Sequence, residues 1–91
     1  MYVIITPQQF LRLARKFFKQ HPDLKPRFAT LLVELQNDPY QPNLKLHALT
    51  GKLGGCYAIS LTYSYRITLT LMVTEQEIIL LDIGSHDEVY R

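Results

Sequence analysis

Three strand-like segments follow one another in the second half of the chain, and their short connections limit the folds it can adopt. In residues 56–63 and 66–73 apolar side chains alternate with polar or small ones, a pattern typical of strands with one buried face. Residues 77–84 are apolar on both faces and are expected in the interior of a sheet. Because a connection as tight as residues 62–65 joins antiparallel neighbours, this half predicts an antiparallel sheet.

The first half predicts one more strand and two helices. Residues 2–6 form a β-branched apolar run, and Thr6 and Pro7 then supply an N-cap and a first-turn proline. Apolar residues recur at helical spacing over residues 10–21 and again over residues 24–36. The order β-α-α-β-β-β therefore predicts an α+β fold, with a helical hairpin on one face of a mainly antiparallel four-stranded sheet.

Composition indicates a single domain over residues 1–91. The chain is 47% hydrophobic and 20% charged, which allows one core and is too short for two. No run of about 18 apolar residues predicts a membrane span, and no basic segment precedes an apolar one at the N-terminus. Cys56 is the single cysteine, so no internal disulfide is expected. These features predict a cytoplasmic protein.

Charge is distributed unevenly along the chain. Residues 1–66 contain nine Lys and Arg against three Asp and Glu, for +6, whereas residues 67–91 contain one against five, for −4; together they give the net charge of +2. The net positive charge of residues 1–66 suggests a polyanionic partner such as nucleic acid. The alternative is that these cations only solvate the two helices, and charge alone favours that alternative.

Six residues of types that transfer protons or hold phosphate lie along the strand-forming half. They are Lys45, His47, Lys52, Arg66, His86 and Tyr90. Singly, each is more often a surface or structural residue. Together they suit cleavage of RNA through the ribose 2′-hydroxyl, because that reaction needs a base, an acid and a cation beside the phosphate.

Arg66 has a definite place in this hypothesis. Strand periodicity puts it on one face with Thr68 and Thr70, opposite the apolar face that the helices would cover. On that open face its planar guanidinium could take a phosphate. No cysteine pair or histidine spacing indicates a metal site, and no phosphate-binding loop or nucleophilic serine motif is present, so no metal or cofactor is expected.

Two stretches resemble the RelE/ParE superfamily of bacterial toxin–antitoxin toxins, nearer its RelE and YafQ branch: LKLHALTGKLGGCYAISLTYSYRITLTL (residues 44–71) and EIILLDIGSHDEVY (residues 77–90). Their SYRI and DIGSHDEVY segments are the most specific. The resemblance implies the same β-α-α-β-β-β fold and an endoribonuclease (mRNA interferase) that cuts mRNA in the ribosomal A site. It also implies a type II toxin–antitoxin system, in which a cognate antitoxin silences the toxin within a hetero-oligomer.

The resemblance assigns roles to four residues. His47 matches a catalytic histidine of YafQ-like toxins and is the implied base. Arg66 matches the arginine that stabilises the phosphate in RelE and YoeB relatives. His86 matches the C-terminal histidine that acts as general acid, and Tyr90 matches an aromatic residue that stacks on, or acts at, the substrate nucleotide.

Four further positions bear on the site. Lys45 and Lys52 fall where RelE-type enzymes concentrate lysines, so the resemblance implies contacts with RNA phosphates. YafQ-like toxins have another histidine and an aspartate where this chain has Ser60 and Ser64.

Two alternatives to a ribonuclease remain: a ParE-like toxin that inhibits DNA gyrase by binding, and a non-toxic binding module of the same fold. ParE relatives generally lack the terminal histidine and aromatic residue, so His86 and Tyr90 favour the ribonuclease.

Overall fold

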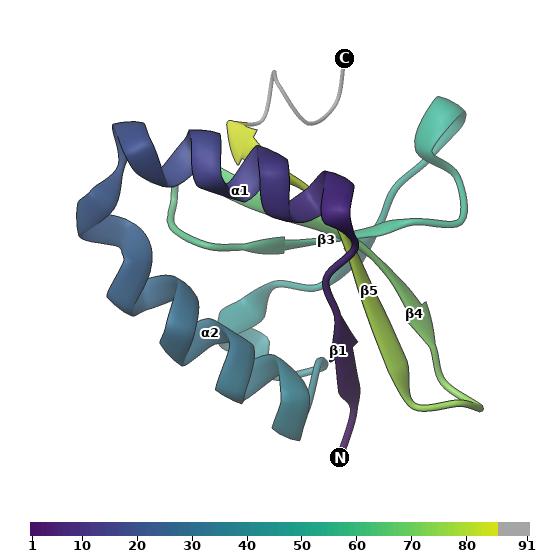
Figure 1. The fold of residues 1–91 in the computed structure, drawn as a ribbon. Coiled ribbons are helices and arrows are strands. Elements are labelled where there is room, and N and C mark those ends of the chain that lie inside the picture. The colour runs from purple at the N-terminus through teal and green to yellow at the C-terminus, as the bar shows by residue number, and fades with distance from the viewer. Residues whose placement is uncertain (86–91) are drawn as a thin grey trace.

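A computed structural model describes residues 1–85 and shows two helices packed against a five-stranded sheet (Figure 1). The strands are β1 (Val3–Ile5), β2 (His47–Ala48), β3 (Tyr57–Ser60), β4 (Tyr65–Met72) and β5 (Glu77–Ser85). The helices are α1 (Gln8–Gln20) and α2 (Lys25–Asn37), and the short 3₁₀ turns are η1 (Pro22–Leu24), η2 (Pro42–Leu44) and η3 (Gly51–Leu53). The predicted α+β class and the helical hairpin on a mainly antiparallel sheet are confirmed.

The sheet has the order β1-β5-β4-β3-β2, with β1 parallel to β5 and all other neighbours antiparallel. The doubly apolar β5 lies in the interior, as its sequence predicts. Four strands were predicted, and β2 is the additional one. Its two residues are too few to show the periodicity that indicates a strand. It matters for function, because it attaches His47 to the edge of the sheet.

The core lies between the helices and one face of the sheet. Phe10, Ala14, Phe17 and Phe18 of α1 are buried at helical spacing, and they share a cluster with Ile67, Leu69, Ile78 and Leu80 of the sheet. Each large apolar side chain so buried contributes about 1.5–3 kcal/mol. Since odd-numbered residues of β4 face the helices, its even-numbered residues from Arg66 to Thr70 face the other way.

The start of α1 differs from the prediction. Pro7, not Thr6, is the N-cap residue, and no side chain caps the helix. Pro7 is itself extended, with ψ of 158°, so it lies before the first helical residue and supplies the first carbonyl, which accepts from the Leu11 N–H at 3.0 Å. Neither helix within residues 1–85 combines the length and apolar character needed to cross a membrane.

Candidate functional site

Strand pairing places His47 and Arg66 on the same face of the sheet. His47 of β2 pairs with Ala58 of β3, which pairs with Thr68 of β4; two residues along, Ser60 pairs with Arg66. Paired residues of antiparallel strands share a face, as do residues two apart on one strand. Two strand spacings and one two-residue step separate the Cα atoms of His47 and Arg66, or roughly 12 Å. A bound nucleotide and the long arginine side chain can span that separation.

His47 is exposed, and its ring contacts the backbone of the residues that precede β2. Its Nδ1 lies 2.9 Å from the carbonyl oxygen of Lys45. Because a carbonyl oxygen only accepts hydrogen bonds, Nδ1 is the donor in this contact. Lys45 itself has a left-handed backbone, with φ of 54°, which turns the chain from η2 toward β2.

Arg66 is half-buried and keeps its charge available. Its guanidinium donates to the carbonyl oxygen of Tyr63 at 3.4 Å. Within residues 1–85 it forms no ion pair; the ion pair found there joins Arg27 and Glu34. A permanently charged, planar group without a carboxylate partner is suited to a phosphate.

The face around Arg66 is less open than the sequence indicates. Thr68 is only 3% exposed, and the hydroxyl oxygens of Thr68 and Thr70 are buried without a hydrogen-bond partner. Thr68 is buried because it lies in the middle of the sheet, between Ala58 on β3 and Asp82 on β5. The accessible part of this face is therefore its rim, where His47 and Arg66 lie.

The remaining predicted site residues differ in placement. Lys45 lies beside His47, whereas Lys52 is exposed in η3, part of a loop that projects beyond the sheet (Figure 1). His86 and Tyr90 lie outside the described residues. The described chain ends at Ser85, one residue after Gly84, and Gly84 pairs with Arg66 across β4 and β5.

Sequence reasoning missed Tyr63 as a site residue. It lies in the turn between β3 and β4, and its side chain is 95% exposed while its carbonyl binds Arg66. An aromatic ring so exposed beside an arginine can stack on a nucleobase. The sequence signal for this residue was its place in the tight TYSY connection. The alternating pattern of residues 56–63 instead assigned Tyr63 to a strand. No group of three His, Cys, Asp or Glu side chains able to hold a metal ion occurs in residues 1–85.

The two serines at positions that carry a histidine and an aspartate in YafQ-like toxins have different surroundings. Ser60 is half-buried on β3 and pairs directly with Arg66. Ser64 is exposed in the turn, where its N–H donates to the hydroxyl oxygen of Thr62 at 3.2 Å. Ser60 thus places a small hydroxyl side chain next to Arg66.

Comparison with solved structures finds this architecture in bacterial toxins. YafQ from E. coli has a TM-score of 0.81 at 17% identity, over 100% of both chains. A metal-bound toxin from Helicobacter pylori has a TM-score of 0.79 at 25% identity, over 99% of this chain and 100% of the other. A chain of the YoeB–YefM complex from Staphylococcus aureus has a TM-score of 0.70 at 18% identity, over 94% of this chain and 98% of the other. No family model and no curated protein matches the sequence.

The chain therefore has the fold of the RelE/ParE toxin superfamily, as its sequence resemblance implies. The fold of YafQ matches this fold over the full length of both chains.

Proposed function

We propose that this protein is the toxin of a type II toxin–antitoxin system and cleaves mRNA. The observation that carries the proposal is the shared sheet face of His47 and Arg66 within a YafQ-like fold. One matching structure is a complex described as the E. coli DinJ–YafQ toxin–antitoxin complex, and another is YoeB–YefM. By analogy, this chain binds a cognate antitoxin in the cytoplasm.

The reaction follows from the chemistry of the two described residues. Nε2 of His47 removes the proton from the ribose 2′-hydroxyl, and the 2′-oxygen attacks the adjacent phosphorus. Arg66 stabilises the negative charge that grows on the phosphate oxygens. The bond between phosphorus and the 5′-oxygen of the next nucleotide then breaks, and an acid protonates that oxygen. The products are a 2′,3′-cyclic phosphate and a 5′-hydroxyl.

The other residues of the proposal surround this centre. His86 supplies the proton to the leaving oxygen, and Tyr90 stacks on the substrate nucleotide. Lys45 and Lys52 bind neighbouring phosphates, and Tyr63 offers a further stacking surface. The substrate is mRNA in the ribosomal A site, a polyanion that suits the net positive charge of residues 1–66.

Expression of the chain without a partner in a bacterial host tests this function. We expect growth arrest with cut mRNA that carries 5′-hydroxyl ends, and loss of both effects on His47→Ala, Arg66→Ala or His86→Ala. Arg12→Ala, at an exposed position on α1, is the matched control and keeps the arrest. Arrest that persists in the first three variants together with DNA damage indicates a gyrase inhibitor instead, and no arrest by the unaltered chain indicates a non-toxic module.

A further inference from the structure

A polar pocket lies between the C-terminal half of α1 and β5. β1 pairs only with residues 77–79 of β5, so the later residues of β5 have no strand on that side within residues 1–85, and α1 packs against this strand. The pocket has a volume of about 150 Å³, and the polar side chains that line it are Lys16, Gln20, His21 and Asp82. None of these four residues takes part in the proposed cleavage.

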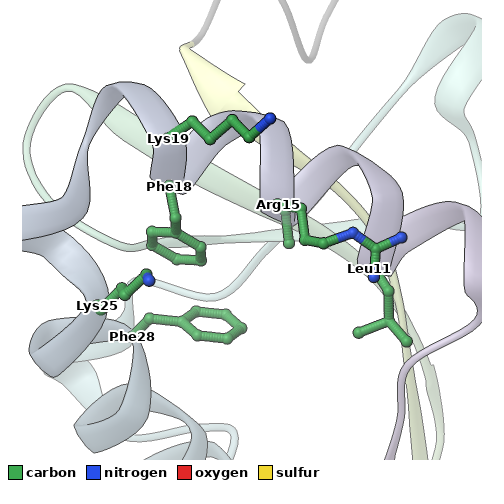
Figure 2. A pocket seen from close by; sticks show the side chains of 7 residues that line it. Leu11, Arg15, Phe18, Lys19, Lys25 and Phe28 are labelled. Atoms are coloured by element: carbon green, nitrogen blue, oxygen red, sulfur yellow. The ribbon is translucent and has the colours of Figure 1, made fainter.

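α1 presents a different kind of surface toward α2. The groove between the two helices has a volume of about 440 Å³ and an apolar floor that includes Leu11, Phe18 and Phe28 (Figure 2). Arg15 and Lys19 line that groove, and no carboxylate is among its residues. The pocket beside β5 instead combines a cation, a carboxylate, an amide and an imidazole. It therefore suits a ligand that both donates and accepts hydrogen bonds.

Asp82 lies next to an irregularity of β5. The pairing register shifts between Thr68 and Leu69 of β4, which leaves Leu81 as an extra residue of β5, and such bulges redirect the neighbouring side chains. Oδ1 of Asp82 accepts from the N–H of Ile83 at 2.7 Å, so the carboxylate is held beside the strand. Because a carboxylate has about four lone-pair sites, it can accept from a ligand as well as from the backbone.

Aromatic contacts position the imidazole of His21 at the end of α1. Its ring centroid lies 4.6 Å from that of Phe17 and 4.7 Å from that of Tyr65. Phe17 also lines the pocket, which thus has an aromatic wall. The side chains of Lys16, Gln20 and His21 form no hydrogen bond or ion pair with any residue of 1–85, so their polar groups are available to a ligand.

The size and lining of the pocket favour a single nucleobase. Its volume is several times the roughly 30 Å³ that one water molecule occupies in the liquid, but lies below the roughly 300–1,000 Å³ of sites for drug-sized ligands. Unstacked bases commonly stack on histidine and aromatic side chains and are read along their edges. A free phosphate fits less well, because Asp82 and the partial negative charge at the end of α1 oppose it.

Guanine matches both charged groups of the pocket at once. It presents N1–H and the N2 amino group side by side, and these two donors suit the two oxygens of a carboxylate. Its O6 and N7 are acceptors that a lysine contacts. Adenine and cytosine would set a ring nitrogen acceptor against Asp82, and uracil would set carbonyl oxygens there, so acceptors would face each other without a proton between them.

We propose that this pocket binds a guanine base, with Asp82 on N1–H and the N2 amino group and Lys16 on O6. The placement of that guanine within the mRNA substrate rests on the proposed function. The pocket lies beside α1, whereas His47 and Arg66 lie on the face of the sheet that the helices do not cover. Guanine binding is therefore separable from RNA cleavage.

Nucleotides that differ in single groups test the pocket. In a nuclear magnetic resonance titration of the purified chain, guanosine monophosphate should shift the methyl signals of Leu13 and Ile83, which line the pocket, and the ring signals of His21. It should bind at least about tenfold more tightly than adenosine monophosphate or inosine monophosphate, which lacks the N2 amino group, because one bidentate contact discriminates bases to about that extent. Inorganic phosphate is the control and should leave these signals in place.

Asp82→Asn should change the specificity of the pocket, which a merely structural role would not do. The asparagine oxygen can still accept from Ile83, but its NH₂ group would meet the N2 amino group of guanine, whereas xanthine carries a carbonyl oxygen at that position. We expect the variant to bind guanosine monophosphate about tenfold more weakly, and xanthosine monophosphate more tightly, than the unaltered chain does.

Lysine variants on the two sides of α1 localise the binding. Lys16→Ala should weaken guanosine monophosphate about tenfold, since a charged donor to O6 is lost. Lys19→Ala removes the same charge on the side of the groove (Figure 2) and is the matched control. That variant should leave binding within about twofold, because only long-range charge changes.

Three results would overturn the proposal: equal binding of the guanosine and adenosine nucleotides, the same shifts with phosphate alone, or no gain for xanthine in Asp82→Asn. An RNA oligonucleotide with one guanine should bind more tightly than the free nucleotide; equal affinities would contradict the placement in mRNA and assign the pocket to a free guanine nucleotide. The two proposals fail separately. Guanine binding without mRNA cleavage would remove the proposed function and keep the pocket, and cleavage without guanine binding would remove the pocket alone.

Discussion

Arg66 is the residue on which the proposed chemistry depends most, because its guanidinium is unpaired with any carboxylate of residues 1–85. Arg66→Ala should lower the rate of mRNA cleavage about 100-fold, the usual cost of removing one donor to a developing oxyanion. Arg66→Lys should recover only part of the loss, since a point charge cannot contact two phosphate oxygens in the same plane. Single-turnover cleavage on programmed ribosomes measures both. Unchanged cleavage by Arg66→Ala would contradict the assignment.

Thr68 allows a prediction about stability at the same scale. Its hydroxyl is buried without a partner, so Thr68→Val, which keeps the shape, should stabilise the protein by about 1 kcal/mol. Thr62→Val is the control, because the Thr62 hydroxyl accepts from the Ser64 N–H and its loss should bring no gain. Urea unfolding compares the free energies. Clear destabilisation by Thr68→Val would mean that the hydroxyl is bonded.

At the scale of elements, the side chain of Arg27 on α2 forms a hydrogen bond to the chain at the end of β3. Arg27 donates through Nε to the carbonyl oxygen of Leu61 at 3.1 Å and pairs with Glu34 at 3.0 Å. Arg27→Ala should lower the free energy of unfolding by about 1–2 kcal/mol, since a charge-assisted bond to a strand end is lost. Glu34→Gln should cost less than about 1 kcal/mol, as partly exposed ion pairs do. Urea unfolding measures the free energy of unfolding of both variants. An equal loss in the two would assign the effect to the ion pair and not to the bond with Leu61.

The helices and the long strands were predictable because each carries a clear hydrophobic period. The buried residues Phe10, Ala14 and Phe17 of α1 are spaced four and three residues apart, and β4 alternates over its whole length. β2 was not predictable, because its two residues are strand only through pairing with β3. Thr6 is not the N-cap because Pro7 is itself extended and the helix begins one residue later, at Gln8.

At the scale of the whole molecule, the sequence indicated His47 and Arg66 as site candidates but did not show that they share one face of the sheet. Their common face depends on a register that runs through Ala58 and Ser60, two small residues without a chemical signature of their own. Tyr63 was missed for a related reason, because its exposure is a property of the turn. The groove between α1 and α2 depends equally on packing, since the pattern of α1 shows that Phe18 is buried but not that Leu11 stays exposed.

The fold thus presents a polar rim on one face of the sheet, a polar pocket beside β5 and a cationic apolar groove in the helical layer. The most direct test of the rim is a nuclear magnetic resonance titration with a short RNA that carries 2′-deoxyribose at its central nucleotide and so cannot be cut there. Side-chain signals of His47 and Arg66 and the methyl signal of Ala58 should shift together, while the methyl signals of Leu11 stay in place. Shifts confined to Leu11 and the groove, or movement of His47 without Arg66, would contradict a shared site for one ribose-phosphate unit.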